Sequence, residues 1–492
     1  MVGRVPQYPL PAQPRRAESP SPVQGEGCMT PLWTSAEIAQ AVSGVASTAF
    51  MATGVAFDSR EVGTGDLFVA LPGETTDGHR FVDQAFAQGA AGAIVSRPVP
   101  HPHILVADTR AALDALGIAG RARTTAQIVG VTGSVGKTGT KEALFAAFDR
   151  IAPGRAHRSL KSYNNHTGVP LSLARMPEST RFGVFEMGMN HAGEIAALTR
   201  LVRPNIAVIT TIAPAHIEML GSIEGIARAK AEIFEGLEPG GTAVIPYDSP
   251  QRDILVEAAK RHGARVMTFG LDKGADVHAV ERVPSKGGGT LVTVQLPDAS
   301  LTMTIGQSGE HWVSNALAVI AAVEAAGGDL AIAGLALAEL QGMAGRGARV
   351  QVQVPGGEAL VIDESYNANP ASMRATLKVL GEQSALRRVA VLGAMRELGQ
   401  EGPRFHAELA EPIARANVDF ALLVGEEMAP LAKALEGKIE FAHVPAAAAA
   451  LDALKGHVGA GDAVLIKASN SVGLGRLVAD LSAGALAEAN KD

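Results

Sequence analysis

One stretch constrains this chain more than any other: residues 128–142, which read IVGVTGSVGKTGTKE. An apolar strand, a glycine-rich loop and a helix start follow one another there. Gly133 and Gly136 allow backbone conformations closed to other residues, so successive N–H groups can point at one anion, and the helix N-terminus adds partial positive charge. Lys137 can then reach terminal phosphates, and the Thr138 hydroxyl can ligate Mg²⁺. The residues predicted to contact a nucleotide here are Gly133, Ser134, Gly136, Lys137 and Thr138.

The glycine spacing differs from that of the common nucleotide-binding loop. That loop has a glycine five residues before the second one, whereas here Val131 holds that position and Gly130 lies one residue earlier. A glycine-rich turn with an incidental Lys-Thr pair is the structural alternative. The order of strand, loop and helix favours phosphate binding over that alternative.

Length and composition bound the remaining possibilities. At 492 residues the chain is long enough for about three domains of roughly 150 residues each. A charged fraction of 19% and a net charge of −7 fit a soluble protein and provide no basic surface for nucleic acid. The single cysteine, Cys28, excludes an intrachain disulfide framework and a cysteine-based zinc site, as expected in a reducing cytoplasm.

No apolar run approaches the roughly 20 residues that span a bilayer, so we expect no stable membrane insertion. Residues 1–29 are rich in proline, serine and charge, and they lack the apolar core of a signal peptide. We expect a disordered tail there. Met29 is an alternative start, which would make the tail an artefact of the recorded sequence.

Residues 30–123 predict a small α/β domain. A short amphipathic helix is expected over 35–42, strands over 55–60 and 67–71, and a helix over 81–88. Ser59 and Arg60 stand at the end of the first of these predicted strands. Polar residues between two strands often only form a turn. An arginine beside a serine at a strand end can also bind phosphate or uracil oxygens.

Residues 124–344 alternate apolar runs with helical patterns, which predicts a mostly parallel sheet with helices on both faces. Ligands gather at the carboxyl ends of such strands, and both Glu186 and His216 follow predicted strands. The predicted strands cover residues 128–131, 182–185, 206–212 and 242–245.

Residues 345–492 alternate in the same way and predict a separate Rossmann-like domain. The glycine pair at 473 and 475 is too weak a signal for a dinucleotide site. The predicted strands cover residues 359–362, 388–392, 420–424 and 463–466.

Several short motifs occur together along the chain. They are residues 132–138 (TGSVGKT), 186–191 (EMGMNH), 213–218 (APAHIE), 230–232 (KAE) and 363–370 (DESYNANP). This combination resembles the Mur ligases, from about residue 30 to the C-terminus. Residues 363–370 are similar to the branch of that family whose substrates are UDP-N-acetylmuramoyl-tripeptide and D-alanyl-D-alanine.

The resemblance implies a reaction in which a substrate carboxylate attacks the γ-phosphate of ATP and an amine then displaces phosphate from the acyl phosphate. Lys137, Thr138 and Glu186 are placed for the charge on the transferring phosphoryl group, and Glu186 is expected to bind Mg²⁺. The resemblance further implies that Lys230 is carbamylated and holds a second Mg²⁺ with His216. On its own, Lys230 would be read as a charge on a solvated helix, and His216 as a structural histidine.

The resemblance also assigns the remaining site residues. Those expected at the UDP-linked substrate are Ser59, Arg60, Asn164, Asn165, Thr167 and His191, the last with helix capping as the alternative. Those expected at the nucleotide are Asn315, facing adenine, and Arg346, Tyr366 and Asn367, which approach when the C-terminal domain swings in. We expect a monomer.

Four positions depart from the commonest pattern of the family: Val135, Gly139, Glu364 and Asn470. Gly139, where threonine is frequent, should weaken the first helical turn by up to ~1 kcal/mol. Asn470, where arginine is frequent, should change the contact with the carboxylate of the dipeptide.

Two alternatives remain open at this point. A sister Mur ligase would add a single amino acid to a shorter precursor, and residues 363–370 argue against it. A P-loop NTPase or small-molecule kinase would need neither a carbamylated lysine nor a separate UDP-binding domain.

Overall fold

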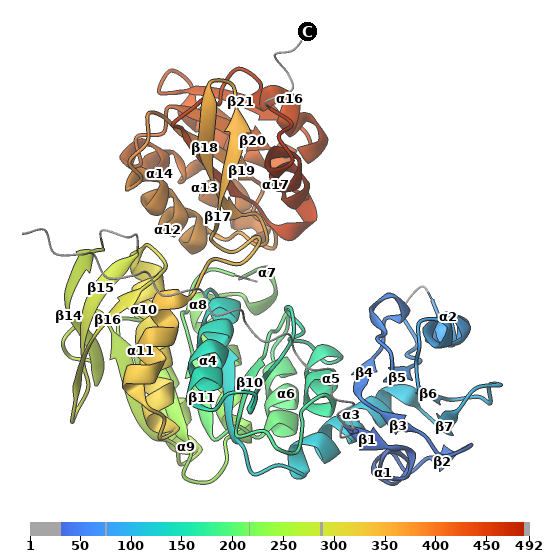
Figure 1. Ribbon diagram of the computed structural model, residues 1–492. Coiled ribbons are helices and arrows are strands. Elements are labelled where there is room, and N and C mark those ends of the chain that lie inside the picture. The colour runs from blue at the N-terminus through green and yellow to red at the C-terminus, as the bar shows by residue number, and fades with distance from the viewer. Residues whose placement is uncertain (1–30, 74–75, 216, 286–288, 487–492) are drawn as a thin grey trace, which may run out of the picture.

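The computed structural model describes residues 31–73, 76–215, 217–285 and 289–486, which form three units (Figure 1). The predicted tail, residues 1–29, and the predicted metal ligand His216 lie outside the described residues. The first unit packs beside the middle one, and the third lies across the end of the middle unit (Figure 1). Within the described residues, no helix combines the length and apolar character needed to cross a membrane.

Within the described residues, the first unit has a mostly parallel sheet with the strand order β2-β7-β6-β5-β4. Strands β1 and β3 form a separate antiparallel pair. Thr34 caps the first helix in a reciprocal pair with Glu37, as its Ser/Thr-x-x-Glu spacing favours. The strands are β1 (Trp33–Thr34), β2 (Val45–Ala46), β3 (Met51–Ala52), β4 (Gly54–Ala56), β5 (Asp66–Val69), β6 (Gly92–Val95) and β7 (His103–Leu105). The helices are α1 (Ser35–Ala41), α2 (Val82–Ala87), α3 (Thr109–Ala122) and the 3-10 turns η1 (Ser59–Glu61) and η2 (Gly78–Phe81).

The middle unit is built on one long sheet, ordered β16-β15-β14-β13-β12-β11-β8-β10-β9 within the described residues. Val129 and Val131 belong to the core on one face, and Ile128 to the core on the other, so β8 is buried on both sides. The strands are β8 (Gln127–Thr132), β9 (Ala156–Arg158), β10 (Phe182–Glu186), β11 (Ile206–Ile209), β12 (Thr242–Pro246), β13 (Arg265–Gly270), β14 (Val277–Pro284), β15 (Thr290–Gln295) and β16 (Ser300–Ile305). The helices are α4 (Lys137–Ile151), α5 (Gly168–Ala174), α6 (Glu194–Val202), α7 (Ile217–Leu220), α8 (Ile223–Ala231), η3 (Glu232–Gly236), α9 (Arg252–Arg261), α10 (Glu310–Ala325) and α11 (Leu330–Glu339).

The third unit has a sheet ordered β17-β18-β22-β19-β20-β21 in the described residues, parallel except for its first pair. The strands are β17 (Ala348–Val354), β18 (Gly357–Glu364), β19 (Arg388–Gly393), β20 (Phe420–Val424), β21 (Glu440–Val444) and β22 (Ala463–Lys467). The helices are α12 (Pro370–Gly381), α13 (Gly402–Ala407), α14 (Ala410–Arg415), α15 (Ala429–Leu435), α16 (Ala450–Leu454), α17 (Gly475–Ser482) and the turns η4 (Gly399–Glu401), η5 (Glu426–Met428), η6 (Ala447–Ala449) and η7 (Asn470–Val472).

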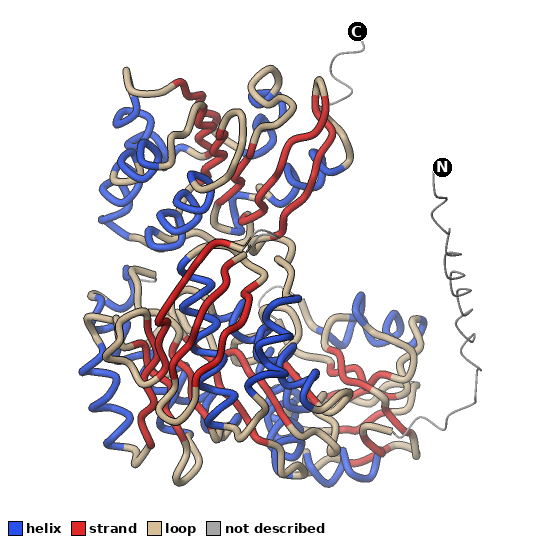
Figure 2. The backbone as a smooth tube through the Cα atoms, turned by 60° about the vertical axis from the view of Figure 1, so that its left-hand side comes forward, coloured by secondary structure: helices blue, strands red, loops and turns tan. Residues whose placement is uncertain are grey.

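Two features of the middle sheet differ from the sequence expectation. The sheet continues into an antiparallel meander, β14 to β16, seen as long red strands in Figure 2. The predicted strand over 206–212 ends at Ile209. Beyond it, the Thr210 hydroxyl donates to the carbonyl of Val135 at 2.5 Å, and the backbone N–H of Ser134 donates to the carbonyl of Thr211 at 2.7 Å, so this stretch lies against the glycine-rich loop.

Candidate active site

The glycine-rich loop joins β8 to α4 and has no room for side chains at its glycines. Gly133 and Gly136 have φ values of +147° and +87°. A Cβ at Gly133 would stand 2.0 Å from Oγ1 of Thr210, and one at Gly136 would stand 2.6 Å from Oδ1 of Asn315. Glycine is therefore required at both positions for conformation and for space.

Two polar side chains of the loop, those of Ser134 and Lys137, line a cavity where they can meet an anion. The Oγ atom of Ser134 is buried and has no hydrogen-bond partner among the described residues. The Nζ atom of Lys137 donates to the carbonyl of Gly133 at 2.8 Å. Burial lowers the pKa of Lys137, and the nearby carboxylate of Glu186 opposes that shift. A bound phosphate would supply the counter-charge that favours the protonated amine.

Glu186 is fixed beside this loop by the sheet register. It ends β10, where it pairs with Val131 of β8, and its side chain is buried. The hydroxyl of Thr138 donates to its Oε2 at 2.9 Å, and Nδ2 of Asn164 donates to its Oε1 at 2.8 Å. A buried carboxylate next to a hydroxyl offers the oxygen ligands that Mg²⁺ prefers.

Lys230 lies in α8 with only 1% of its surface exposed. Burial lowers its pKa well below the ordinary lysine value, and the positive charge of Lys137 lowers it further. The alternative of a lysine on a solvated helix face is therefore wrong. Its predicted partner, His216, lies outside the described residues.

A cavity of about 410 Å³ lies between the middle and third units, with the glycine-rich loop as part of its wall. Most of the residues predicted at the nucleotide line it. They are Ser134, Gly136, Lys137, Thr138, Asn315, Arg346, Tyr366 and Asn367, joined by Glu186 and Asn164. Gly133 and Lys230 are not among the lining residues.

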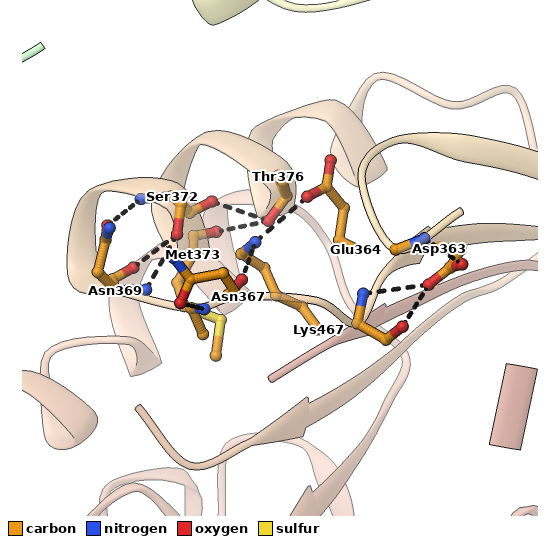
Figure 3. A network of polar contacts seen from close by, with 11 residues as sticks. Asp363, Glu364, Asn367, Asn369, Ser372, Met373, Thr376 and Lys467 are labelled. Atoms are coloured by element: carbon orange, nitrogen blue, oxygen red, sulfur yellow. Dashed lines mark hydrogen bonds and ion pairs between the residues drawn. The ribbon is translucent and has the colours of Figure 1, made fainter. Parts of the chain in front are cut away.

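The third unit supplies part of the wall of this cavity, with a polar network around the start of α12 (Figure 3). Lys467, at the end of β22, is buried, and its Nζ donates to the carbonyl of Asn367 at 2.9 Å and lies 3.3 Å from Oε2 of Glu364. Asn369 caps α12 by accepting from the backbone N–H of Ser372 at 2.9 Å. These contacts hold Glu364, Asn367 and Asn369 of the 363–370 motif in place between β18 and α12.

Arg346 connects the third unit to the middle unit. Its Nη2 donates to Oγ of Ser162 at 3.3 Å, and its guanidinium lies 4.2 Å from the centre of the Tyr366 ring. An arginine at this boundary can meet the oxygens of a phosphate chain in the cavity.

A second cavity, of about 460 Å³, is lined by residues of the first unit, with Thr167 of the middle unit at its wall. The hydroxyl of Ser59 donates to Oε1 of Gln84 at 3.1 Å, and Arg60 pairs with Asp58 at 2.6 Å. Arg110 donates to the hydroxyl of Thr167. The polar or charged residues lining the cavity are Asp58, Ser59, Arg60, Thr76, Gln84, Arg110 and Thr167.

The 159–168 segment runs from one cavity to the other. Ser162 and Asn164 line the first cavity, and Thr167 lines the second. Asn165 lines neither of the two, and its Oδ1 accepts from the backbone N–H groups of Thr167 and Gly168.

His191 is not brought to either cavity. Its side chain is 62% exposed and lies 3.1 Å from Oε1 of Glu194. Its expected substrate contact has no geometric support here, and the pairing fits a role at the start of α6.

Several residues that line the first cavity were assigned no role from the sequence, and Ser162, Trp312 and Lys467 are among them. Lys467 had a usable signal, because a charged residue follows directly on the apolar run of β22 and strand ends gather ligands. For Ser162 and Trp312 the only sequence signal was that each lies close to residues with a predicted role.

Comparison with known proteins covers all three units. Family profiles match residues 52–120 (Mur ligase family, catalytic domain), 131–323 (Mur ligase middle domain) and 345–470 (Mur ligase, glutamate ligase domain). A relative from Synechocystis sp., the UDP-N-acetylmuramoyl-tripeptide--D-alanyl-D-alanine ligase, is 37% identical over 439 residues, which is 87% of this chain and 91% of the relative. The chain belongs to the Mur ligase family. The resemblance inferred from the sequence motifs is thereby confirmed.

Another relative and two solved structures are similar to this chain over most of its length. The Escherichia coli enzyme of the same name is 36% identical, over 76% of this chain and 81% of the relative. A crystal structure of MurF from Acinetobacter baumannii superposes with a TM-score of 0.80 at 34% identity, covering 92% of this chain and 99% of that one. MurF ligase from Thermotoga maritima in complex with ADP superposes with a TM-score of 0.73 at 28% identity, covering 88% and 97%. These likenesses confirm the predicted α/β fold class, whereas the exact boundaries near residues 123 and 344 stay predictions.

Proposed function

We propose that this chain is an ATP-dependent ligase that joins D-alanyl-D-alanine to UDP-N-acetylmuramoyl-tripeptide, forming the pentapeptide precursor of peptidoglycan. The observation that carries the proposal is the pair of cavities joined by the 159–168 segment. One cavity holds a phosphate-binding loop and a buried carboxylate, and the other presents serine and arginine side chains. The names of the relatives support the same substrates.

The reaction has two steps. An oxygen of the peptide carboxylate forms a bond to the γ-phosphorus of ATP while the bond from that phosphorus to the β–γ bridging oxygen breaks, and ADP leaves. The amine of the dipeptide then attacks the acyl carbon, the bond from that carbon to the phosphate oxygen breaks, and the amine nitrogen loses a proton. Both steps build negative charge on oxygen, which fixed cationic donors stabilise.

The chain's own residues divide this work by position. Lys137 lies at the loop, and Arg346 faces the same cavity from the third unit. In our proposal they hold the phosphate chain between them, while Asn315, which lies against Gly136, orients the base. Closing the third unit over the cavity would exclude water, which protects the acyl phosphate from hydrolysis.

The oxygen donors around the loop fit a divalent cation. Thr138 and Glu186 would hold a first Mg²⁺, and a carbamate on Lys230 with His216 would hold a second. Bound Mg²⁺ neutralises phosphate charge and polarises the γ-phosphoryl group. The lowered pKa of Lys230 supports the carbamate, because only an uncharged amine reacts with carbon dioxide.

Product analysis tests the function. The protein is incubated with ATP, Mg²⁺, D-alanyl-D-alanine and a UDP-tripeptide ending in either meso-diaminopimelate or lysine, and products are identified by mass spectrometry. We expect one new amide bond and one phosphate released per turnover, with release requiring both the tripeptide and the dipeptide. A product carrying a single added amino acid would favour the sister ligases, and release without any acceptor would favour an NTPase.

A monomeric enzyme of the cytoplasm is part of the same proposal. The single cysteine fits a reducing compartment. Light scattering on the purified chain at working concentration should give a mass near 50.6 kDa.

A further inference from the structure

The 159–168 segment contacts all three units, and the reaction as described above uses only part of it. Within the middle unit, hydrogen bonds from Lys141 and Gly188 are among its anchors. The fully buried Lys141 donates from Nζ to the carbonyl of Lys161 at 2.6 Å. Lys161 has a φ of +50°, a left-handed conformation that turns the segment sharply there. The backbone N–H of Gly188 donates to the carbonyl of Asn164 at 2.8 Å.

The same segment reaches the first unit through Glu61. The hydroxyl of Tyr163 donates to Oε2 of Glu61 at 2.7 Å, and the ammonium of Lys161 pairs with its Oε1. The Tyr163 ring also lies 5.7 Å, centre to centre, from the ring of Phe57. Glu61 belongs to η1 with Ser59, and Phe57 and Ser59 both line the second cavity.

The other side of the segment faces the first cavity, which is lined by Ser162 and Asn164. Asn164, next to Tyr163, donates to Glu186, and Ser162 on its other side accepts from Arg346 of the third unit. One short run of backbone therefore lies between the wall of the second cavity and two side chains expected at the phosphates. Movement of η1 when a ligand fills the second cavity would be passed through Tyr163 to its neighbours.

We propose that Glu61 and Tyr163 are positioning residues that couple occupancy of the second cavity to the placement of Asn164 and Glu186 at the first. The inference rests on the proposed function, because it takes the UDP-linked precursor as the ligand of the second cavity. Its consequence is that precursor and nucleotide strengthen one another's binding through the protein. Such coupling is reciprocal and typically amounts to about 5-fold to 150-fold in affinity.

Folding stability gives little reason for the ion pair between Lys161 and Glu61. Both partners of the ion pair are solvent-exposed, with 64% of the Lys161 side chain and 32% of the Glu61 side chain accessible. Exposed pairs of this kind contribute little to folding. A role in linking two ligand sites explains why three side chains converge on one exposed contact.

The test is a binding cycle. Affinity for a non-hydrolysable ATP analogue with Mg²⁺ is measured by calorimetry with and without saturating UDP-N-acetylmuramoyl-tripeptide, and the ratio is the coupling factor. We expect a factor of about fivefold or more in the unmodified chain and close to one in Tyr163→Phe and Glu61→Gln. The affinity of each variant for either ligand alone should stay within about twofold of the unmodified chain.

Matched substitutions away from the segment provide the controls. Tyr247→Phe removes a hydroxyl at the end of β12, beside Arg252 and apart from both cavities. Glu235→Gln removes a carboxylate that pairs with Arg200, at 2.6 Å. Both controls should keep the coupling factor of the unmodified chain.

Several outcomes would overturn the inference. A coupling factor of one in the unmodified chain would do so, and so would a factor that Tyr163→Phe and Glu61→Gln both preserve, since direct contact between the two ligands would then explain it. Loss of affinity for the precursor alone, with coupling intact, would make the two residues simple contacts. If the unmodified chain binds the nucleotide but no precursor, the proposed substrate is wrong and the inference falls with it.

Discussion

The indole of Trp312 lies against Gly139, so closely that a Cβ at position 139 would stand 3.0 Å from its Cη2 atom. Gly139 is in the first turn of α4, directly after the residues predicted to bind phosphate, and Trp312 lines the first cavity from α10. The expected penalty of glycine in this helix is therefore accompanied by a packing gain. The space of a missing side chain is filled by an aromatic ring.

Gly139→Thr should disturb this pair. Threonine has the better helix propensity, but its branched side chain meets the indole in a buried position, and overpacking typically costs about 1–3 kcal/mol. We expect a lower melting temperature and a higher KM for ATP. Trp312→Phe in the same chain should recover part of both, because the smaller ring leaves room. If Gly139→Thr is as stable as the unmodified chain, the two positions are not in tight contact.

Glu186→Gln should separate metal binding from substrate binding. The substitution keeps the shape of the side chain but removes the charge beside the Thr138 hydroxyl. We expect a drop in kcat of about 100-fold or more and weaker binding of Mn²⁺, used as a spectroscopic substitute for Mg²⁺, with precursor affinity unchanged. Glu339→Gln, at an exposed ion pair with Arg150, is the control. Unchanged Mn²⁺ affinity in Glu186→Gln would remove this carboxylate from the metal site.

Lys230 tests the carbamate. Lys230→Ala should reduce turnover by about 100-fold or more, and added short-chain carboxylates should restore part of it by replacing the missing oxygen ligand. Lys230→Met keeps the buried volume and should lose turnover equally while staying closer to the original melting temperature. Lys260→Ala, at an exposed position of α9, is the matched control. Full turnover in Lys230→Ala would exclude the carbamate.

His157 predicts a pH dependence of stability. Its Nε2 lies 2.8 Å from the carbonyl of Ser172, and burial lowers its pKa from 6.5 to about 4. Between pH 6.5 and about 4 the imidazole of His157 is protonated in the unfolded chain and neutral in the folded one. The contribution of His157 to the free energy of unfolding is therefore fully present above pH 6.5 and is lost as the pH falls toward 4. Because the residue keeps some solvent exposure, about 3 kcal/mol is an upper bound.

Chemical denaturation at several pH values measures that contribution. His157→Gln should flatten the decline in unfolding free energy between pH 6.5 and 4, whereas His262→Gln, at the exposed end of α9, should leave it unchanged. An identical slope in all three chains would mean that other groups carry the acid sensitivity.

The central strand and the glycine-rich loop of the middle unit could be predicted because short stretches of sequence determine both of them. Strand β8 is a continuous apolar run, and the following Gly-x-x-Gly-Lys-Thr sequence needs its glycines for backbone conformation. The antiparallel meander was not predicted, because its strands are half exposed and mix threonine with apolar residues. Strand β14, for example, is exposed over most of its second half.

Residues of the candidate site could be predicted where a functional side chain stands in a recognisable motif. They were harder to predict where the role of a residue depends on its tertiary contacts. Glu186, Asn315 and Arg346 reach the cavity as the motifs indicated. Lys141 reads as an ordinary charge near a helix start, and only the tertiary structure buries it against the carbonyl of Lys161. His191 matches a family motif and lines neither cavity, so its substrate contact stays a prediction.

The short path between the two cavities has a consequence for inhibitor chemistry. A fragment that mimics a nucleotide phosphate and one that mimics the uridine end would sit at opposite ends of the 159–168 segment. A tether of matching length would make the second binding event intramolecular and raise the avidity without new contacts. A tether that is too short would forfeit the gain entirely, so the span of this loop sets the linker that a bisubstrate compound needs.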